Sequence, residues 1–364
     1  MKVYQILTTV AYGDAVSNDC LAIGKLLEAN GYKTAIYAEN ISKSAEKLGV
    51  RKFRLLPKIR PDDIILYHLS TGTELNKLIK KYNCRKYIIY HNTTPPDFFV
   101  RYSGRLTRLC HKGLEETKDL KDSFDGGFCV SDFNRQQLIS YGYKCNLTVR
   151  PILIPFEDYE KTPDAEVLKE MGGEAASNEH KIKNILFVGR IAPNKKQEDV
   201  ISLLYAYRKL YKDDPVRLIL AGNPEGMEKY ADRVETYAKE LGINDIVFTG
   251  HSSFAKILAY YRSADAFVSM SEHEGFCVPL VEAMYFKIPI LAYASTAIPE
   301  TLGGTGILLE NKDYSYGAFC LHEILHNKEL REKMIEEQNE RLKDFSYENV
   351  SKMFMKQFKE FTGI

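Results

Sequence analysis

The chain has 364 residues, of which 45% are hydrophobic and 27% are charged, and its formal net charge is +1. This composition excludes collagen, coiled-coil and disordered chains, and the length predicts two globular domains or one large one. No apolar segment approaches the roughly 20 residues that a membrane-spanning helix needs. The start of the chain lacks the pattern of a secretory signal, and the 7 cysteines form no CxxC pair. We therefore expect a cytoplasmic protein with reduced thiols.

The small net charge conceals a difference between the two halves of the chain. Residues 1–160 hold 24 Lys and Arg against 18 Asp and Glu, a balance of +6, and residues 161–364 hold 26 against 31, a balance of −5. A basic first half favours an anionic partner such as a membrane surface or a lipid pyrophosphate. A chance difference between two solvated surfaces explains the numbers equally well. With no tryptophan, no dense basic run and no recognisable binding motif, we expect no nucleic-acid partner.

Short apolar segments alternate with helical patterns through the first half. Strands are predicted at residues 2–10, 33–39, 62–70, 85–92 and 126–133. Helices are predicted over residues 16–31 and 132–141. Strands that alternate with helices are typical of a parallel sheet with helices on both faces.

The polar, acidic segment at residues 156–182 predicts a domain boundary, after which the alternation starts again. Strands are predicted at residues 183–190, 216–222, 245–250, 266–270 and 288–293. Helices are predicted over residues 197–211, 227–241, 253–262 and from 279 onward, and an amphipathic helical pattern runs through 315–364. The chain is thus expected to be an α/β protein of two doubly wound, Rossmann-like domains that face each other across a cleft. Such sheets bind ligands beyond the carboxyl ends of their strands.

The segment SMSEHEGFCVPLVEAM at residues 269–284 is the strongest candidate for a binding site. Gly275 permits a close backbone approach, and Pro279 fits the first turn of a helix. Backbone N–H groups at that helix start would attract a phosphate. Glu274 in the loop and Glu282 in the first helical turn suit the paired hydroxyls of a ribose or hexose. As structural residues, Glu274 would be a loop carboxylate and Glu282 a partner of the helix dipole.

A second candidate segment is ILFVGRIAPNKKQED at residues 185–199, where a predicted strand leads into Gly189 and Arg190. Arg190 and Lys195 suit the oxygens of a diphosphate, because a guanidinium binds as a fork and an ammonium as a point charge. Lys196 fits the alternative, that of a solvated surface charge.

Two further patterns call for interpretation. In the first half, His91 ends a predicted strand, where it could handle a proton, although a lone histidine is more often structural. His68 repeats this pattern more weakly, and Gly13-Asp14 follows the first strand as either a ligand contact or a bare turn. In the second half, HEILH at residues 322–326 matches the zinc-peptidase pattern. Its place in an amphipathic tail helix without a third histidine favours a chance match.

Taken together, these segments resemble the retaining glycosyltransferases of family 4 (glycosyltransferase group 1), which have the two-domain GT-B fold. Glu274 and Glu282 match the E-x7-E motif within EGFCVPLVEAM, and VGRIAPNK at residues 188–195 matches the VGR-loop-Lys motif. The segments VFTGH, LILAGN and AIPETLGGTGILL fit the same pattern, and YHNTTPP and GGFCVSDFNRQQL fit it less closely. The resemblance covers nearly the whole chain and is clearest over residues 183–310.

The resemblance implies a metal-independent, retaining hexosyltransferase that uses a nucleotide-sugar donor, either GDP-mannose or a UDP-hexose, and no cofactor. Catalytic roles would fall to Arg190, Lys195, Glu274 and His91. The donor would contact Gly189, Arg190, Lys195, Gly222, Asn223, His251, Glu274, Gly275, Phe276, Cys277, Val278 and Glu282. The acceptor, a glycan or a lipid-linked sugar, would meet Gly13, Asp14 and His91. An acceptor-side domain at residues 1–160 would be followed by a donor-binding domain at 161–345, and the last helix, at about 346–364, would pack back on the first.

The sequence departs from the family pattern at four places. Cys277 and Lys196 stand where the family usually has glycine. Lys287 ends a Tyr-Phe-Lys segment that replaces the usual small-x-Gly, and Gly13-Asp14 replaces two adjacent glycines. Two other functions remain open on the same fold: a nucleotide-sugar epimerase or phosphorylase, or a sugar-nucleotide-binding protein without catalysis. We expect polysaccharide biosynthesis in the cytoplasm, with contact at the inner face of the membrane as an open question.

Overall fold

A computed structural model of the chain describes residues 1–11, 13–172 and 182–364. Contacts divide it into two compact units. The first comprises Met1–Val100, Gly104–Phe156 and Asp344–Ile364, and the second comprises Arg101–Ser103 and Glu157–Lys343. The predicted boundary segment at 156–182 contains the division after Phe156, while its residues 173–181 lie outside the described part.

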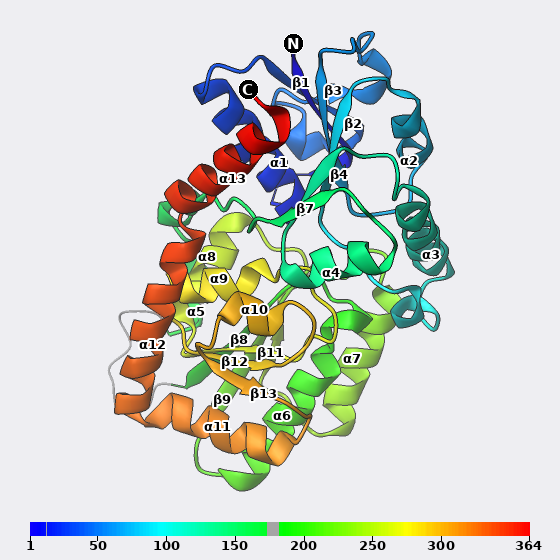
Figure 1. Cartoon of the computed structure of the whole chain (residues 1–364). Helices are drawn as coiled ribbons and strands as arrows, with labels where there is room; N and C mark the ends of the chain where they lie inside the picture. The colour runs from blue at the N-terminus through cyan, green and yellow to red at the C-terminus, as the bar shows by residue number, and fades with distance from the viewer. Residues whose placement is uncertain (12, 173–181) are drawn as a thin grey trace. The chain divides into compact units, whose positions relative to one another are not determined.

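The first unit is built on a parallel sheet of seven strands among the described residues, in the order β3-β2-β1-β4-β5-β6-β7 (Figure 1). Its strands are β1 (Val3–Val10), β2 (Thr34–Ile41), β3 (Arg51–Lys52), β4 (Ile64–Leu69), β5 (Arg85–Tyr90), β6 (Gly126–Cys129) and β7 (Asn146–Val149). Its α-helices are α1 (Ala15–Ala29), α2 (Leu75–Leu78), α3 (Gly104–Asp119), α4 (Asp132–Ser140) and α13 (Tyr347–Thr362). The short 3-10 turns η1 (Lys43–Ala45), η2 (Phe53–Leu55), η3 (Ile79–Lys81) and η4 (Pro96–Phe99) connect them.

The second unit has a parallel sheet of six strands among the described residues, in the order β10-β9-β8-β11-β12-β13. Its strands are β8 (Lys183–Val188), β9 (Val216–Ala221), β10 (Ile246–Phe248), β11 (Ala266–Ser269), β12 (Ile290–Tyr293) and β13 (Ile307–Leu309). Its helices are α5 (Ala165–Glu170), α6 (Gln197–Leu210), α7 (Glu228–Glu240), α8 (Phe254–Ser263), α9 (Val278–Tyr285), α10 (Ile298–Leu302), α11 (Tyr314–His326) and α12 (Lys328–Leu342). The 3-10 turn η6 (Pro193–Lys195) also lies in this unit, while η5 (Phe156–Glu160) and η7 (Lys343–Phe345) contain points where the chain passes from one unit to the other.

The prediction of two doubly wound, Rossmann-like parallel sheets is confirmed. Strand β4 shows why the apolar segments were informative, since all six of its residues are buried in the middle of the sheet. At the two ends of α1, Asp14 caps the start, and Gly31 follows the end with a positive φ of 83°. The continuous helical pattern over 315–364 was too simple, because Asn327 ends α11 and caps α12, and η7 precedes α13.

Helix α13, drawn in red in Figure 1, belongs to the core of the first unit. Val350, Phe354 and Phe358 recur at four-residue spacing and are fully buried against residues such as Val3 and Ile23. A fully buried apolar side chain of this size contributes about 1.5–3 kcal/mol to stability. The first unit therefore depends on a helix that follows the whole second unit in the chain.

No helix in the described part of the chain combines the length and apolar character that crossing a bilayer would require.

Candidate active site

Most of the predicted donor-binding residues lie at one edge of the second sheet. Residues 189–195 follow β8, Gly222 and Asn223 follow β9, His251 comes shortly after β10, and residues 271–277 follow β11. These four strands are neighbours and run parallel. Their carboxyl ends therefore meet at the edge where such sheets bind ligands.

Lys195 and Glu274 form the central contact of this edge. The Lys195 ammonium lies 2.6 Å from each oxygen of the Glu274 carboxylate, and the two side chains are 22% and 8% exposed. Burial alone lowers the pKa of Lys195, but the adjacent Glu274 outweighs it and the net shift is upward. The ammonium is therefore held in its charged form beside the loop.

The backbone around this ion pair adopts conformations that glycine favours. Lys196, Cys277 and Thr296 have φ angles of 53°, 74° and 47°, in the left-handed region. Thr296 is β-branched, for which a positive φ is unusual, and its hydroxyl accepts a hydrogen bond from the Glu274 N–H at 2.9 Å. Two of these positions, Lys196 and Cys277, are those where the family pattern has glycine. Glycine suits positions 196 and 277 because both have a positive φ. In this chain, lysine and cysteine adopt that strained backbone conformation at the site.

Gly189 and Gly222 allow two chain segments to pass very close together. A Cβ atom on Gly222 would lie 1.9 Å from the Gly189 carbonyl oxygen. Backbone hydrogen bonds join the same segments, from Gly189 N–H to Ala221 O at 3.0 Å and from Ile191 N–H to Asn223 O at 3.1 Å. Glycine is therefore required at position 222 by packing, in addition to any role beside a ligand.

Arg190 has a different surrounding from Lys195. Its side chain is exposed, and one guanidinium nitrogen donates to the Glu225 carbonyl oxygen at 2.8 Å. Its backbone carbonyl accepts a hydrogen bond from Gln197 at the start of α6. Among the described residues the two cations thus have separate partners, and their joint role at a diphosphate stays a prediction.

Glu282 lies beside tyrosines. Its two carboxylate oxygens accept hydrogen bonds from Tyr159 at 2.8 Å and Tyr261 at 2.6 Å. Burial raises the pKa of Glu282, and the two tyrosine hydroxyls partly offset that rise. Its predicted place in the first turn of the helix is wrong, because α9 begins at Val278 and Glu282 is its fifth residue. Residues 278–281 provide the first turn, with Pro279 in it as expected.

The other predicted donor-binding residues lie in the loops of the second unit, and two of them form hydrogen bonds with neighbouring residues. The Asn223 amide oxygen accepts from the Glu225 N–H at 2.9 Å, and His251 is exposed in its loop. Phe276 is buried, and its carbonyl accepts from the Thr301 hydroxyl. Gly275 lies in the loop between Glu274 and α9, without the positive φ that its neighbour Cys277 has.

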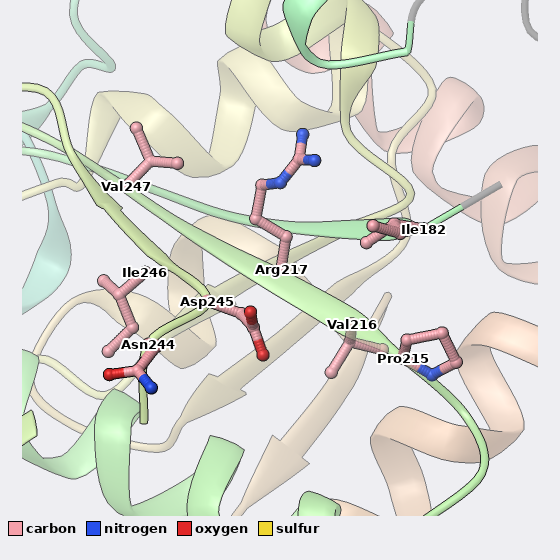
Figure 2. Close-up of a pocket in the computed structure, with 8 residues that line it drawn as sticks. All are labelled: Ile182, Pro215, Val216, Arg217, Asn244, Asp245, Ile246 and Val247. Atoms are coloured by element: carbon pink, nitrogen blue, oxygen red, sulfur yellow. The ribbon is translucent and has the colours of Figure 1, made fainter. Parts of the chain in front are cut away.

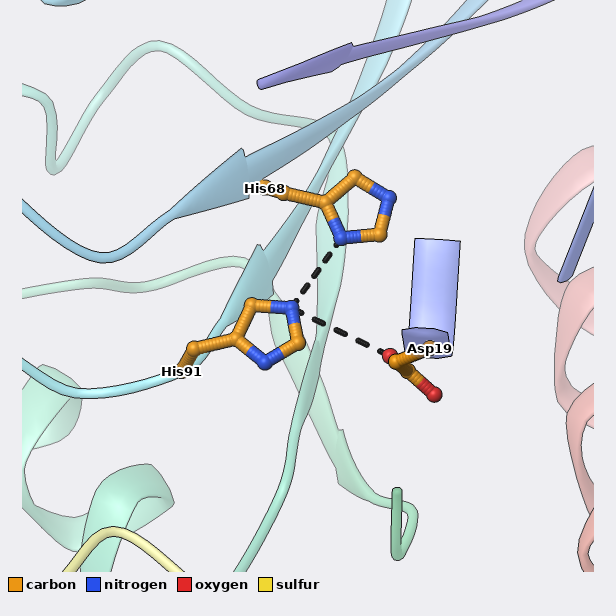
Figure 3. A group of neighbouring side chains, drawn as sticks. All are labelled: Asp19, His68 and His91. Carbon is orange, nitrogen blue, oxygen red and sulfur yellow. Dashed lines mark hydrogen bonds and ion pairs between the residues drawn. The ribbon is translucent and has the colours of Figure 1, made fainter. Parts of the chain in front are cut away.

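In the first unit, His91 directly follows β5, as expected, and its side chain is only 1% exposed. Its Nε2 lies 3.0 Å from Nδ1 of His68 (Figure 3). The Nε2 of His68 lies 2.9 Å from the Gln5 amide oxygen. Burial lowers the pKa of His91 to about 4 and holds the pKa of His68 well below its usual value. Both imidazoles are therefore neutral near pH 7. Asn92, next to His91, is the turn residue, with a φ of 78°.

Asp14 and Gly13 lie near the start of α1. Asp14 is the N-cap of this helix and accepts from the Ser17 N–H at 3.0 Å and the Ser17 hydroxyl at 2.8 Å. The Asp14 carboxylate is close enough to His91 to raise its pKa slightly against the effect of burial. The turn interpretation thus accounts for Asp14, and an acceptor contact there stays a prediction.

Three polar residues of the first unit have places that sequence reasoning missed: Gln5, Asp19 and Arg150. Asp19 and Arg150 are fully buried and form a two-bonded ion pair, with N–O distances of 2.8 and 2.6 Å. Burial alone raises the pKa of Asp19, but Arg150 reverses the shift and holds it below its usual range. A signal was present for Gln5, because a polar residue inside an apolar strand must find a buried partner.

The HEILH segment lies on α11. His322 stacks on Tyr211 with ring centroids 3.9 Å apart, and His326 Nε2 lies 2.6 Å from the Asp214 carboxylate. Possible ligand atoms of Asp214, His322 and His326 fall within 4.8 Å of one another. Glu323 accepts a hydrogen bond from Asn327 at the start of α12. Since each side chain of the pattern has a contact within the domain, these contacts explain it without peptidase chemistry.

A pocket of about 240 Å³ lies at the opposite, amino-terminal edge of the second sheet, lined by Ile182, Asp245 and neighbouring residues (Figure 2). Its charged residues serve structural contacts: Asp245 pairs with Arg208 at 3.3 Å, and Arg217 donates to the Glu170 carbonyl. The pocket lies away from the predicted site residues, so we assign it no role in the chemistry.

Comparison with known proteins gives this arrangement a family. Residues 174–341 match the family described as "Glycosyl transferases group 1". Over these residues, the chain is similar to the group 1 glycosyltransferases. The match covers the loops that carry Lys195 and Glu274, so the motif resemblance and the family agree on this domain.

The curated relatives are about a quarter identical in sequence to this chain over the aligned residues. D-inositol 3-phosphate glycosyltransferase of Corynebacterium urealyticum is 25% identical over 226 residues, 61% of this chain and 53% of the relative. O-antigen chain mannosyltransferase B of Escherichia coli is 26% identical over 250 residues, 66% and 63% of the two chains. Alpha-monoglucosyldiacylglycerol synthase of Streptococcus pneumoniae is 26% identical over 235 residues, 63% and 50%. The chain spans about half the length of the curated relatives that it matches.

Solved structures resemble the whole chain. HepE from Anabaena, in complex with UDP-glucose, has a TM-score of 0.75 at 14% identity and covers 99% of this chain and 100% of its own. Sucrose-phosphate synthase of Thermosynechococcus elongatus has a TM-score of 0.74 at 15% identity, with both chains covered completely. At these identities the likeness establishes the fold of each unit, which is the GT-B type of doubly wound sheet.

Proposed function

We propose that the chain is a retaining glycosyltransferase that moves a hexosyl group from a nucleoside-diphosphate sugar to a hydroxyl of a glycan or lipid-linked acceptor. The observation that carries this proposal is the half-buried Lys195–Glu274 pair at the carboxyl edge of the second sheet. It sets a cation beside a carboxylate, in the part of the chain that matches the group 1 glycosyltransferases.

The transfer reaction requires positive charge beside the diphosphate of the donor, where the bond to the sugar breaks. As the bond from the sugar C1 to the diphosphate breaks, negative charge collects on the leaving phosphate oxygens, and stabilising that charge is the largest electrostatic task of the reaction. Lys195 and Arg190 would supply the charge without a metal ion. The acceptor oxygen would bond to C1 on the same face, and its proton would pass to the leaving phosphate.

The carboxylates would hold the hydroxyls of the donor. Glu274 would accept from the hexose and Glu282 from the ribose, each with lone pairs beyond those that its present partners use. Tyr159 and Tyr261 would fix the orientation of Glu282 through their hydroxyls. Asn223 and His251 would lie near the nucleobase. In the first unit, His91 and Gly13-Asp14 would serve the acceptor side.

A thermal-shift screen with nucleoside diphosphates, UDP-glucose and GDP-mannose tests the donor. A true donor raises the melting temperature by binding the folded state. Among the similar proteins, HepE was solved with UDP-glucose, and one relative is named as a mannosyltransferase. Both nucleotides therefore belong in the screen.

Turnover with an acceptor then separates the candidate functions. Release of the nucleoside diphosphate that requires an added sugar acceptor supports transfer. Turnover without an acceptor, or with phosphate, would indicate an epimerase or a phosphorylase, and binding without turnover would indicate a binding protein. NMR of the fresh product gives its anomeric configuration and so tests retention.

The cations have a direct test. Arg190→Ala is expected to lower turnover at least about a hundredfold, since one transition-state charge contact is worth about 3 kcal/mol. Lys195→Ala should lower turnover by a similar factor. Glu282→Ala should weaken nucleotide binding more than it lowers the rate of the chemical step. Lys209→Ala, an exposed lysine in the last turn of α6, is the control. Near-normal activity of Arg190→Ala would remove Arg190 from the diphosphate site.

Peripheral membrane contact is a second part of the proposal and rests on the first unit. Its sequence half carries a balance of +6, with 24 basic and 18 acidic residues over 1–160. Arg105 and Arg108 are exposed on α3, and nearby Val100 is 61% exposed. One relative is named for a diacylglycerol lipid product.

Flotation with anionic liposomes at low salt tests this contact. Binding that Arg105→Glu with Arg108→Glu abolishes, and that Lys333→Glu in the second unit leaves intact, would support it. If the wild-type protein does not float with the vesicles, the membrane contact is wrong, and the transfer proposal is unaffected.

A further inference from the structure

A chain of buried hydrogen-bonding groups crosses three neighbouring strands of the first unit. Gln5 lies on β1, His68 on β4 and His91 directly after β5, and these strands pair in that order. The Gln5 amide nitrogen lies 3.0 Å from the Cys20 carbonyl oxygen on α1. The chain then continues from Gln5 to His68 and from His68 to His91 over 2.9 and 3.0 Å. Gln5 and His68 are both 0% exposed.

The chemistry of the end groups sets the direction of every hydrogen bond in this chain. A backbone carbonyl can only accept, so the Gln5 NH2 group must face Cys20 and its oxygen must face His68. His68 must then donate from Nε2. A neutral His68 with its proton on Nε2 has a lone pair on Nδ1, which faces His91 (Figure 3). His91 therefore donates from Nε2 to His68, and its own lone pair is on Nδ1.

Packing keeps the first link in place. A Cβ atom on Gly24 of α1 would lie 3.2 Å from the Gln5 amide nitrogen, tighter than usual contacts. Glycine at this position lets α1 come close enough for Gln5 to reach Cys20. The close packing of α1 thus leaves room for the hydrogen bond that sets the amide orientation.

The last atom of the chain is the one that points to a ligand. His91 Nδ1 is buried and has no hydrogen-bond partner among the described residues. A buried lone pair without a donor is costly, so such an atom calls for an explanation. A hydroxyl group is a suitable donor for it, and a sugar presents hydroxyl groups.

We propose that Gln5 and His68 are positioning residues that hold His91 in its Nε2-protonated tautomer, so that Nδ1 accepts a hydrogen bond from a sugar hydroxyl. This inference rests on the proposed function for the identity of the hydroxyl. His91 accepts a hydrogen bond in this role and transfers no proton. His91 touches the substrate, whereas Gln5 and His68 act only through it.

The neighbouring charges fit this arrangement and leave little capacity for a metal ion. Asp19 lies 3.8 Å from His91 Nε2, beyond hydrogen-bond range. Both Asp19 oxygens are engaged by the Arg150 guanidinium, and one also accepts from the Leu153 N–H. Both ring nitrogens of His68 have partners too. A cation placed among these groups would displace existing bonds and face the Arg150 charge.

The tautomer can be measured without any substrate. In histidine labelled with 15N, long-range proton–nitrogen NMR separates protonated from bare ring nitrogens, and His91→Gln identifies the His91 signals by their loss. We expect a bare Nδ1 and a protonated Nε2 on His91 in the wild-type protein at pH 7.5. A protonated Nδ1 would overturn the inference, whether or not the protein transfers sugar.

Two variants of His68 test the positioning role. His68→Gln keeps a donor toward Gln5 and an acceptor toward His91, whereas His68→Leu has neither. We expect His68→Leu to lower kcat at least about tenfold, because a loosened tautomer disables a positioned imidazole. The KM for the donor should change little, and His68→Gln should retain most of the rate.

A matched control variant is available, and different outcomes would contradict the inference and the proposed function. His111→Leu, on an exposed position of α3 in the same unit, should leave kcat unchanged. Equal rates for His68→Leu and the wild type would overturn the inference and leave the transferase intact. An absence of turnover with every sugar nucleotide would instead contradict the proposed function, while the NMR result would still decide the tautomer.

Discussion

In the second unit Lys195 and Glu274 lie beyond the strand ends, whereas in the first unit Gln5 and His68 lie within strands and are joined to His91 by buried hydrogen bonds. Lys195 and Glu274 are charged, partly accessible, and held by loops with strained backbone. Gln5, His68 and His91 are uncharged and buried. Under the proposed function, the second unit supplies charge to the ligand and the first unit presents one fixed acceptor atom.

The largest expected effect concerns the buried ion pair beside the histidines. Asp19→Ala leaves the fully buried Arg150 guanidinium without its partner, so we expect a loss of about 3–5 kcal/mol in the free energy of unfolding. Urea denaturation measures it. Glu348→Ala removes one side of an ion pair that is 71% and 74% exposed on α13 of the same unit. That control should cost no more than about 0.5 kcal/mol. Equal losses would contradict the rigid, prearranged character of the first unit.

Acid should weaken the first unit through its neutral histidines. Burial lowers the pKa of His91 from 6.5 to about 4, so the unfolded chain takes up a proton between these pH values and the folded chain does not. The contribution of neutral His91 to the free energy of unfolding is fully present above pH 6.5 and is lost as the pH drops toward 4. The shift corresponds to about 3 kcal/mol at most. Denaturation at pH 7.5, 6 and 5 should show a smaller pH dependence in His91→Gln, and an unchanged dependence would contradict the burial effect.

A smaller effect should follow from crowding the close approach in the second unit. Gly222→Ala places a methyl group against the Gly189 carbonyl. We expect a loss of about 2 kcal/mol, typical of overpacking, together with weaker binding of the sugar nucleotide. Gly104→Ala, whose nearest contact would be 3.5 Å away at a flexible arginine, is the control. A variant of position 222 as stable as this control would show that the loop adapts more freely than its packing indicates.

The smallest predicted change tests the strained backbone and is a gain. Lys287 follows the C-cap of α9 with a φ of 56°. The N–H groups of Lys287 and Ile288 donate to the carbonyls of Met284 and Ala283, the Schellman pattern that favours glycine. Lys287→Gly should raise stability by about 1 kcal/mol. Lys287→Ala keeps the unfavourable φ and should gain nothing. If both substitutions behave alike, relief of strain is not the cause.

Much of the fold could be predicted because its strands are apolar and buried. β4 and β9 stood out for that reason. The short strands β3, β7 and β13 did not, since segments of two to four residues carry too little pattern. Helix α3 was also missed, although Leu106, Leu109 and Cys110 recur at helical spacing; its buried residues are the small Gly113 and Thr117. A Cβ on Gly72 would lie 2.8 Å from the Gly113 nitrogen, which shows that small residues make this contact.

The residues of the second-unit site and those of the first-unit site also differed in how well the sequence could predict them. Lys195 and Glu274 could be predicted because both belong to segments with a recognisable spacing, and the structure pairs them. The pairing of Glu282 with Tyr159 could not, because the two residues are far apart in the sequence. Gln5, Asp19 and Arg150 are single polar residues whose partners lie on other elements. A lone buried polar residue signals that a partner exists but does not say which one.

The position of α13 has a consequence for how the protein is made. A ribosome releases residues in order, so the second unit leaves the exit tunnel complete while the first still lacks Phe354 and Phe358. The strands of the first unit must therefore wait, with part of their apolar surface uncovered, until α13 has been translated. Chaperone dependence during translation should accordingly fall on these strands, although they are synthesised before the second unit.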